Sequence, residues 1–189
     1  INEDALLQAK KIDEGKALYE EVVALAENQR KEYGEQYSAS SRFVENLQEA
    51  EDKIIRLRKY CKFAFRNIPE AEEVLNLSSI MPLVFSDWLH FTTYFYERLS
   101  ERQDWITLLA PFGVVPEDIT NNLADLSELK ELQELHQREI GDAQRATKVR
   151  NAKVVELKIW YSELRDLAKV IFEDEDSQYL EKLGILVRS

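Results

Sequence analysis

The chain has 189 residues and a formal net charge of -11, with one cysteine and two histidines. These counts exclude an internal disulfide framework and a metal site built from several histidines. The excess of 36 acidic over 25 basic residues opposes general binding to nucleic acid, because an acidic chain repels the phosphate backbone. No run of about 20 apolar residues occurs, so we expect no membrane span.

Two regions of the chain are almost free of glycine and proline. Residues 1–68 hold no proline and only two glycines, Gly15 and Gly34, and residues 117–183 hold no proline and only Gly141. Glycine and proline are the strongest breakers of regular structure, so both regions are typical of long helices. The sequence therefore predicts an all-α protein, which we expect to form a single helical-bundle domain over residues 1–189.

The first region carries two apolar stripes at helical spacing. Steps of three and four residues place side chains on one face of a helix, so both stripes are predicted to face the core. The helix is expected to end near Asn67, because the residue before Pro69 is disfavoured in the helical conformation. The first stripe is Ala9, Ile12, Tyr19, Val23, Ala26 and Tyr33, and the second is Phe43 or Val44, Leu47, Ile54, Leu57, Cys61, Phe65 and Ile68.

The middle of the chain is rich in aromatic residues. After a connector at residues 70–80 with one helical turn, residues 81–112 hold eight of the 19 aromatic side chains. We expect a central helix that begins near Pro82, since proline is favoured in a first turn. Its wide apolar arc indicates burial on more than one side, and residues 111–116 are expected to break it.

The last region begins with Glu117 and Asp118, whose negative charge suits a helix start. A row of leucines follows at residues 123–135, and a later apolar stripe includes Trp160, which we expect to be buried. The helix is expected to end near the acidic run 173–176. A short final helix at residues 177–183 is expected to stop at Gly184.

An internal similarity links the two long regions. KEYGEQYSAS at residues 31–40 aligns with REIGDAQRAT at 138–147, an offset of 107 residues from Gly34 to Gly141, and two shorter blocks follow in the same order. The pattern predicts two tandem helical hairpins, about 1–77 and 117–186, joined by the aromatic segment 81–112 in an antiparallel bundle. We favour hairpin turns at the two glycines, which lie in the most polar part of each copy. A continuous helix through Gly34 is the alternative, because a glycine inside a helix costs only ~1 kcal/mol.

Residues 141–189 resemble the tails of a group of uncharacterised bacterial helical proteins. In that group a G-x-x-x-x-A-T-x-x-R-N stretch precedes a tryptophan-bearing helix and a final L-E-x-L-G-I. The resemblance implies a helical fold and no activity. The matching residues are Gly141, Ala146, Thr147, Arg150, Asn151, Trp160, Leu180, Glu181, Leu183, Gly184 and Ile185.

The sequence offers no catalytic constellation. Neither histidine follows a glutamate by three residues, as a di-iron bundle requires; Asp87 before His90 makes only one weak pair. We expect His90 to be partly buried and His136 to be solvated. Cys61 lies on an apolar stripe and is interpreted as a buried hydrophobe. No nucleotide-binding or hydrolase motif is present. We therefore predict no catalytic residue, no metal site and no cofactor.

The aromatic segment supplies the one candidate binding site. Its side chains have three possible roles, which are core packing, an apolar ligand pocket and an exposed groove for a partner. Core packing is the commonest role of aromatics at helical spacing. A basic cluster at residues 53–66 is interpreted as a solvated helix face rather than a nucleic-acid stripe. The candidate residues are Phe85, Trp88, Phe91, Phe95 and Trp105.

These observations favour a non-enzymatic helical scaffold or protein-interaction module that acts through a protein partner or a homo-oligomer. The alternative is a helical bundle that binds a small apolar ligand with residues 85–112. We expect a soluble cytoplasmic protein without nucleic-acid partners. The chain begins at Ile1 rather than methionine, which is compatible with the removal of a leader.

Overall fold

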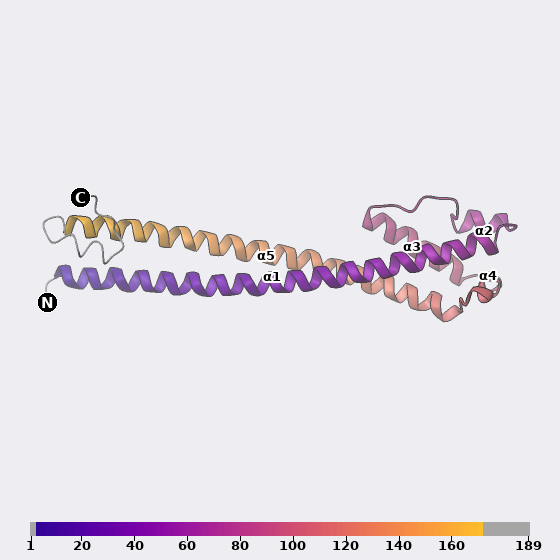
Figure 1. Ribbon diagram of the computed structural model, residues 1–189, viewed down its shortest axis with the longest axis horizontal. Coiled ribbons are helices and arrows are strands. Elements are labelled where there is room, and N and C mark those ends of the chain that lie inside the picture. The colour runs from indigo at the N-terminus through magenta and orange to yellow at the C-terminus, as the bar shows by residue number, and fades with distance from the viewer. Residues whose placement is uncertain (1–2, 172–189) are drawn as a thin grey trace. The chain divides into compact units, whose positions relative to one another are not determined.

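The structure, a computed structural model, describes residues 3–171, with side chains from residue 11 to 170. Within these residues there is no strand, so the all-α prediction is confirmed. Figure 1 shows the helices in chain order. They are α1 (Glu3–Ala64), α2 (Pro69–Val74), α3 (Phe85–Ser100), α4 (Gln103–Leu109), the short 3-10 helix η1 (Ala110–Phe112) and α5 (Pro116–Ile171).

The contacts divide the chain into two compact units. Unit 1 consists of Ile1–Gln36 and Glu139–Ser189, and unit 2 consists of Tyr37–Arg138. Helices α1 and α5 each contribute one segment to each unit. That the 189 residues form a single domain stays a prediction.

Both long helices run through the glycines at which we favoured hairpin turns. α1 has 62 residues and includes Gly34, and α5 has 56 residues and includes Gly141. The two predicted hairpins, 1–77 and 117–186, are therefore wrong, and the alternative of a continuous helix is confirmed for α1. No atom lies within 4 Å of where a Cβ would stand at either glycine, so only the small helix-propensity cost opposes continuation.

The two long helices pair with each other in antiparallel order. In unit 1 the Gln29 side chain donates to the Thr147 hydroxyl at 2.9 Å, and in unit 2 Ser40 and His136 form a hydrogen bond of 3.0 Å. The 107-residue offset matches Gln29 to His136 and Ser40 to Thr147, so the two bonds join equivalent positions of the repeat. This correspondence supports the duplication, which stays a prediction.

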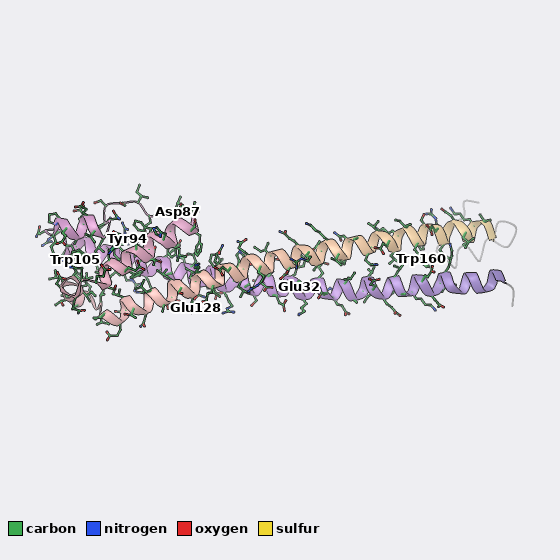
Figure 2. The ribbon with its side chains drawn as sticks, turned by 180° about the vertical axis from the view of Figure 1, so that it is seen from behind. Glu32, Asp87, Tyr94, Trp105, Glu128 and Trp160 are labelled. Carbon is green, nitrogen blue, oxygen red and sulfur yellow. The ribbon has the colours of Figure 1, made fainter. Side chains whose placement is uncertain are left out.

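Unit 1 is a two-helix pair with a seam at alternating steps of three and four residues. The least exposed positions of α1 there include Gly15, Leu18, Val22 and Leu25. Trp160 of α5 is half-buried rather than fully buried (Figure 2), and its ring lies against Gly15 so closely that a Cβ has no room. The same indole Nε1 donates to the Lys11 carbonyl at 3.1 Å. Such heptad spacing is that of a coiled-coil seam.

The first predicted core stripe faces solvent, which corrects the sequence analysis. Ile12, Tyr19, Val23 and Tyr33 keep 46, 60, 39 and 49% of their surface exposed. Tyr19, Val23 and Tyr33 each follow a seam position by one residue, and one residue turns a helix by about 100°. The seam therefore uses the neighbouring stripe and leaves this one uncovered.

Unit 2 packs α2, α3 and α4 around the second part of α1 and the first part of α5. The second predicted stripe is confirmed, because Ile54, Leu57, Cys61 and Phe65 are all buried. Buried leucines of α5 and apolar side chains of α3 and α4 complete this core. Aromatic contacts add to it, as between the tilted rings of Phe65 and Trp105, whose centres lie 5.7 Å apart.

The central segment forms two helices instead of one. α3 begins at Phe85, three residues after Pro82, and the helical conformation is interrupted before α4 at Arg102, whose φ and ψ are -120° and 80°. The connector prediction is confirmed, since α2 is the short helix expected within it. The start of α5 at Pro116 also agrees with the prediction.

The expected helix end at residues 173–176, the final helix at 177–183 and the stop at Gly184 lie outside the described residues. Within the described residues no helix is long and apolar enough to cross a membrane.

Candidate protein-interaction site

The loop between α2 and α3, residues 75–84, exposes three large apolar side chains, which stand on either side of half-buried Met81 and Pro82. Ile80, Leu83 and Val84 keep 93, 101 and 62% of their surface exposed, whereas Leu75 and Leu77 at its other end are buried. We call residues 75–84 the apolar loop. An apolar group of this kind on a surface is typical of a contact with another molecule.

Arg58 of α1 holds the base of the apolar loop. Its Nη2 donates to the carbonyl oxygens of Asn76, Leu77 and Ser79 at 3.0, 3.0 and 2.8 Å. Asn76 takes a φ of 47°, a left-handed conformation in which asparagine is enriched. The three bonds fix the loop backbone, so its exposed tip is presented by an ordered base.

The Arg58 guanidinium is buried, with 5% of the residue exposed, among rings and carbonyl groups. It stands 4.8 Å from the centre of the Phe91 ring, a cation–π distance. Burial lowers the pKa of Arg58 from its usual value, but a guanidinium keeps its proton in proteins. Its positive charge is therefore stabilised by carbonyl dipoles and an aromatic face, and it remains a strong hydrogen-bond donor to the loop.

Carboxylates lie on both sides of the apolar loop in the sequence. The Ser78 hydroxyl donates to the Glu72 carboxylate of α2, and exposed Asp87 stands in the first turn of α3 (Figure 2). Negative charge beside an apolar tip disfavours an anionic lipid surface. It favours a protein partner whose apolar pocket is bordered by basic side chains.

The structure divides the predicted binding residues between the core and the loop support. Trp88, Phe95 and Trp105 expose 3, 1 and 2% of their surface and fill the core of unit 2. Phe91 is half-buried beneath Arg58, and half-buried Phe85 packs on Phe43 with ring centres 5.3 Å apart. Core packing is thus the role of three of the five, and Phe91 supports the loop through Arg58.

Sequence reasoning missed the apolar loop itself. Ile80, Leu83 and Val84 were treated as part of a connector and the start of a helix. The sequence does hold a sign of this loop, which is a cluster of aliphatic residues around Pro82. These residues follow neither a helical nor a strand periodicity, so no regular element is predicted to bury them.

Three polar groups lie buried along one face of α3. Trp88, Thr92 and Tyr96 follow at steps of four residues, and their side-chain polar atoms have no hydrogen-bond partner among the described residues. A buried polar atom without a partner costs roughly 1–3 kcal/mol. This row makes the core of unit 2 less stable than its apolar packing alone would.

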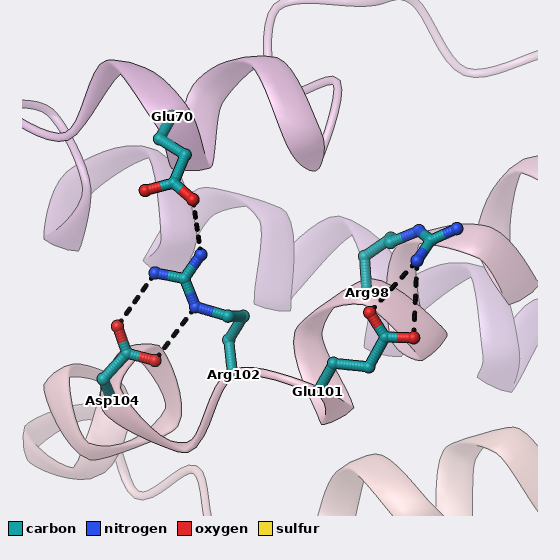
Figure 3. A network of polar contacts seen from close by, with 5 residues as sticks. All are labelled: Glu70, Arg98, Glu101, Arg102 and Asp104. Carbon is teal, nitrogen blue, oxygen red and sulfur yellow. Dashed lines mark hydrogen bonds and ion pairs between the residues drawn. The ribbon is translucent and has the colours of Figure 1, made fainter.

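A network around Arg102 joins α2 to α4 (Figure 3). Arg102 contacts Glu70 at 2.7 Å and Asp104 at 3.0 Å, and its guanidinium lies 3.8 Å from the centre of the Trp105 ring. The hydrogen bonds that Arg102 donates to Asp104 and, second, to Glu70 raise the pKa of Arg102, and its bonds to Asp104 lower the pKa of that carboxyl group. The network stands where the predicted central helix breaks, between α3 and α4.

The two histidines have environments opposite to those expected. His90 is exposed, whereas His136 is half-buried, bonded to Ser40 and stacked on Phe43 with ring centres 5.4 Å apart. The interpretation of Cys61 as a buried hydrophobe is confirmed. Desolvation raises the pKa of its thiol to about 12, which keeps it protonated and unreactive near neutral pH.

The basic residues 53–66 do not form one stripe. Lys53 contacts Glu49 at 2.7 Å and Asp125 at 2.9 Å, which raises the pKa of Lys53, and Arg58 is buried. Arg56 and Lys59 are exposed, as predicted for a solvated face.

In the part of the chain that the structure describes, one group of three carboxylates comes close together in unit 1. Oxygens of Glu32, Glu139 and Asp142 lie within 4.8 Å of one another. Arg145 contacts Asp142 at 2.8 Å and offsets part of the repulsion. Half-buried carboxylates on a helix pair commonly occur without an ion.

Comparisons with family models, with curated proteins and with solved structures gave no match. The resemblance of residues 141–189 to a bacterial group therefore stays a prediction.

Proposed function

We propose that the protein is a non-enzymatic helical scaffold that binds another protein through the apolar loop. The observation that carries this proposal is the nearly complete exposure of Ile80 and Leu83 on a backbone that Arg58 holds in place. Preorganisation reduces the entropy that a loop loses on binding, so a fixed apolar tip binds more tightly than a mobile one.

The expected partner presents an apolar pocket with basic side chains at its border. Apolar side chains that enter a pocket supply most of the binding free energy at such contacts. The carboxylates of Glu72 and Asp87 would meet the basic border and speed association.

Photo-crosslinking tests this proposal in two steps. A benzophenone amino acid replaces Leu83 in the full chain, and in a control it replaces Leu108, which is 46% exposed on α4 of the same unit. We expect a protein adduct from position 83 that is absent at position 108. Equal adducts at both positions would contradict a specific contact at the loop.

The captured partner is then purified and titrated against the unlabelled protein. The double variant Ile80→Ser/Leu83→Ser is expected to weaken binding at least ten-fold, because it removes the two most exposed apolar side chains. Its stability should stay within about 0.5 kcal/mol of the parent, as for other exposed positions. Unchanged binding by a folded double variant would overturn the proposal.

A further inference from the structure

The exposed stripe of α1 in unit 1 is a second surface, separate from the apolar loop. It consists of exposed Ile12, Tyr19, Val23 and Tyr33 and half-buried Ala26, with Lys16 and Arg30 at the two remaining positions of the same spacing. The steps between successive members alternate between four and three residues, which is the spacing of a coiled-coil seam. The stripe thus has the pattern of a helix–helix interface but lies exposed beside the seam that α5 occupies.

The chemistry of this stripe selects its partner. Its two cations, Lys16 and Arg30, are both exposed, and Lys16 contacts only the exposed Asp13 of its own helix at 3.9 Å among the described residues. Such exposed pairs contribute little. Tyr19 and Tyr33 keep 60 and 49% of their surface exposed, and the Tyr33 hydroxyl also contacts the Thr147 hydroxyl of α5 at 3.3 Å. A complementary partner would place aromatic rings against Lys16 and Arg30 and cations against the rings of Tyr19 and Tyr33.

We propose that the stripe binds the same stripe of a second copy of this chain, in antiparallel orientation. An overlap centred between Ala24 and Leu25 sets Lys16 opposite Tyr33 and Tyr19 opposite Arg30. Each of these layers becomes a cation–π pair and occurs twice by symmetry.

The centre of the same overlap is apolar. Val23 of one copy stands opposite Ala26 of the other, so a larger side chain meets a smaller one on both sides of the axis. From Lys16 to Tyr33 the overlap spans roughly 25 Å of helix at 1.5 Å per residue.

The parallel alternative has the opposite charge pattern. In register, it would set Lys16 against Lys16 and Arg30 against Arg30, and facing like charges destabilise a helix pair. Charge complementarity therefore distinguishes the antiparallel dimer from the parallel one.

Sedimentation equilibrium of the purified full chain tests the dimer. We expect a mass of twice 22.1 kDa at high concentration. The double variant Tyr19→Glu/Val23→Glu should raise the dimer dissociation constant at least ten-fold. The matched control, Val155→Glu/Ile159→Glu, alters two equally exposed residues of α5 in unit 1 outside the stripe and should leave that constant unchanged.

Engineered cysteines test the orientation in a Cys61→Ala background. Lys16→Cys and Tyr33→Cys chains, mixed and oxidised, should form the mixed disulfide in excess over either homodisulfide. A parent that stays monomeric at several hundred micromolar, a dimer that persists in folded Tyr19→Glu/Val23→Glu, or preferred Lys16→Cys homodisulfides would overturn the proposal. Binding through the apolar loop is measured separately with Ile80→Ser/Leu83→Ser, so either proposal can fail alone.

Discussion

The two segments of α1 carry similar apolar stripes and use them in opposite ways. In unit 2 the stripe through Ile54, Cys61 and Phe65 is buried, because α3, α4 and α5 surround it. In unit 1 the stripe through Tyr19 and Val23 is exposed, because α5 alone packs on the helix and uses the adjacent seam. The number of neighbouring elements, rather than the stripe itself, decides whether an apolar face becomes core.

The test with the largest expected effect on stability replaces one aromatic residue from each stripe. Phe65→Ala should lower the free energy of unfolding of unit 2 by about 3–5 kcal/mol, as for a buried phenylalanine. Tyr19→Ala should change that of unit 1 by less than about 0.5 kcal/mol at concentrations where the chain is monomeric. Hydrogen exchange resolved by segment measures both. A similar loss in the two variants would contradict the assigned burial.

Arg58 holds the base of the apolar loop in unit 2, and its replacement should give the next largest loss of stability. Arg58→Met should lower stability by about 2–3 kcal/mol, because three carbonyl oxygens lose a charged donor. Proteolytic cleavage within residues 75–84 should also become faster. The control Arg56→Met changes an exposed arginine two residues away. Equal protection of the loop in both variants would show that Arg58 does not hold it.

Two glycines of α1 in unit 1 should respond to alanine with opposite signs. Gly15→Ala should destabilise the helix pair by about 1–3 kcal/mol, because the new methyl group overlaps the Trp160 ring. Gly34→Ala should stabilise it by up to about 1 kcal/mol, because alanine favours the helix and the space is open. Thermal unfolding of the two variants measures both changes. Stabilisation by Gly15→Ala would place Trp160 elsewhere.

The last effect is a pH dependence that Cys61 of unit 2 carries. The pKa of Cys61 is raised to about 12, above the value near 8.5 of an exposed thiol. The folded state therefore keeps a proton that the unfolded chain releases at high pH. The contribution of the buried thiol to the free energy of unfolding is complete below about pH 8 and declines as the pH rises past about 9. Urea unfolding from pH 7 to 10 should show a slope approaching about 1.4 kcal/mol per pH unit. Cys61→Ala should remove that slope; an equal slope in the variant would assign it to another group.

Several features of the fold followed from local sequence rules. Pro69 predicted the end of the first helix near Asn67, and α1 ends at Ala64. The negative charge of Glu117 and Asp118 predicted a helix start, and α5 begins at Pro116. The burial of Cys61 and Phe65 followed from their spacing. The turn favoured at Gly34 rested on the polar residues around it, and it is wrong because the helical spacing continues through the glycine, as in the alternative.

The candidate sites were harder to predict from the sequence than the helices were. Phe91 was identified as a candidate, but its position beneath Arg58 depends on how α3 packs on α1, a contact between residues far apart in the chain. The exposure of Ile80 and Leu83 depends on the same packing.

The sequence by itself determined the helical class, some helix boundaries and the apolar stripes, because these depend on interactions between residues a few positions apart. Only the tertiary structure decided which stripe of α1 faces α5, where Arg58 finds its carbonyl partners and which apolar residues stay uncovered. The physical reason is that two adjacent stripes on one helix both carry apolar side chains, Leu18 and Val22 on one and Tyr19 and Val23 on the other. Contacts made by other helices, such as the Trp160 ring on Gly15, select between them.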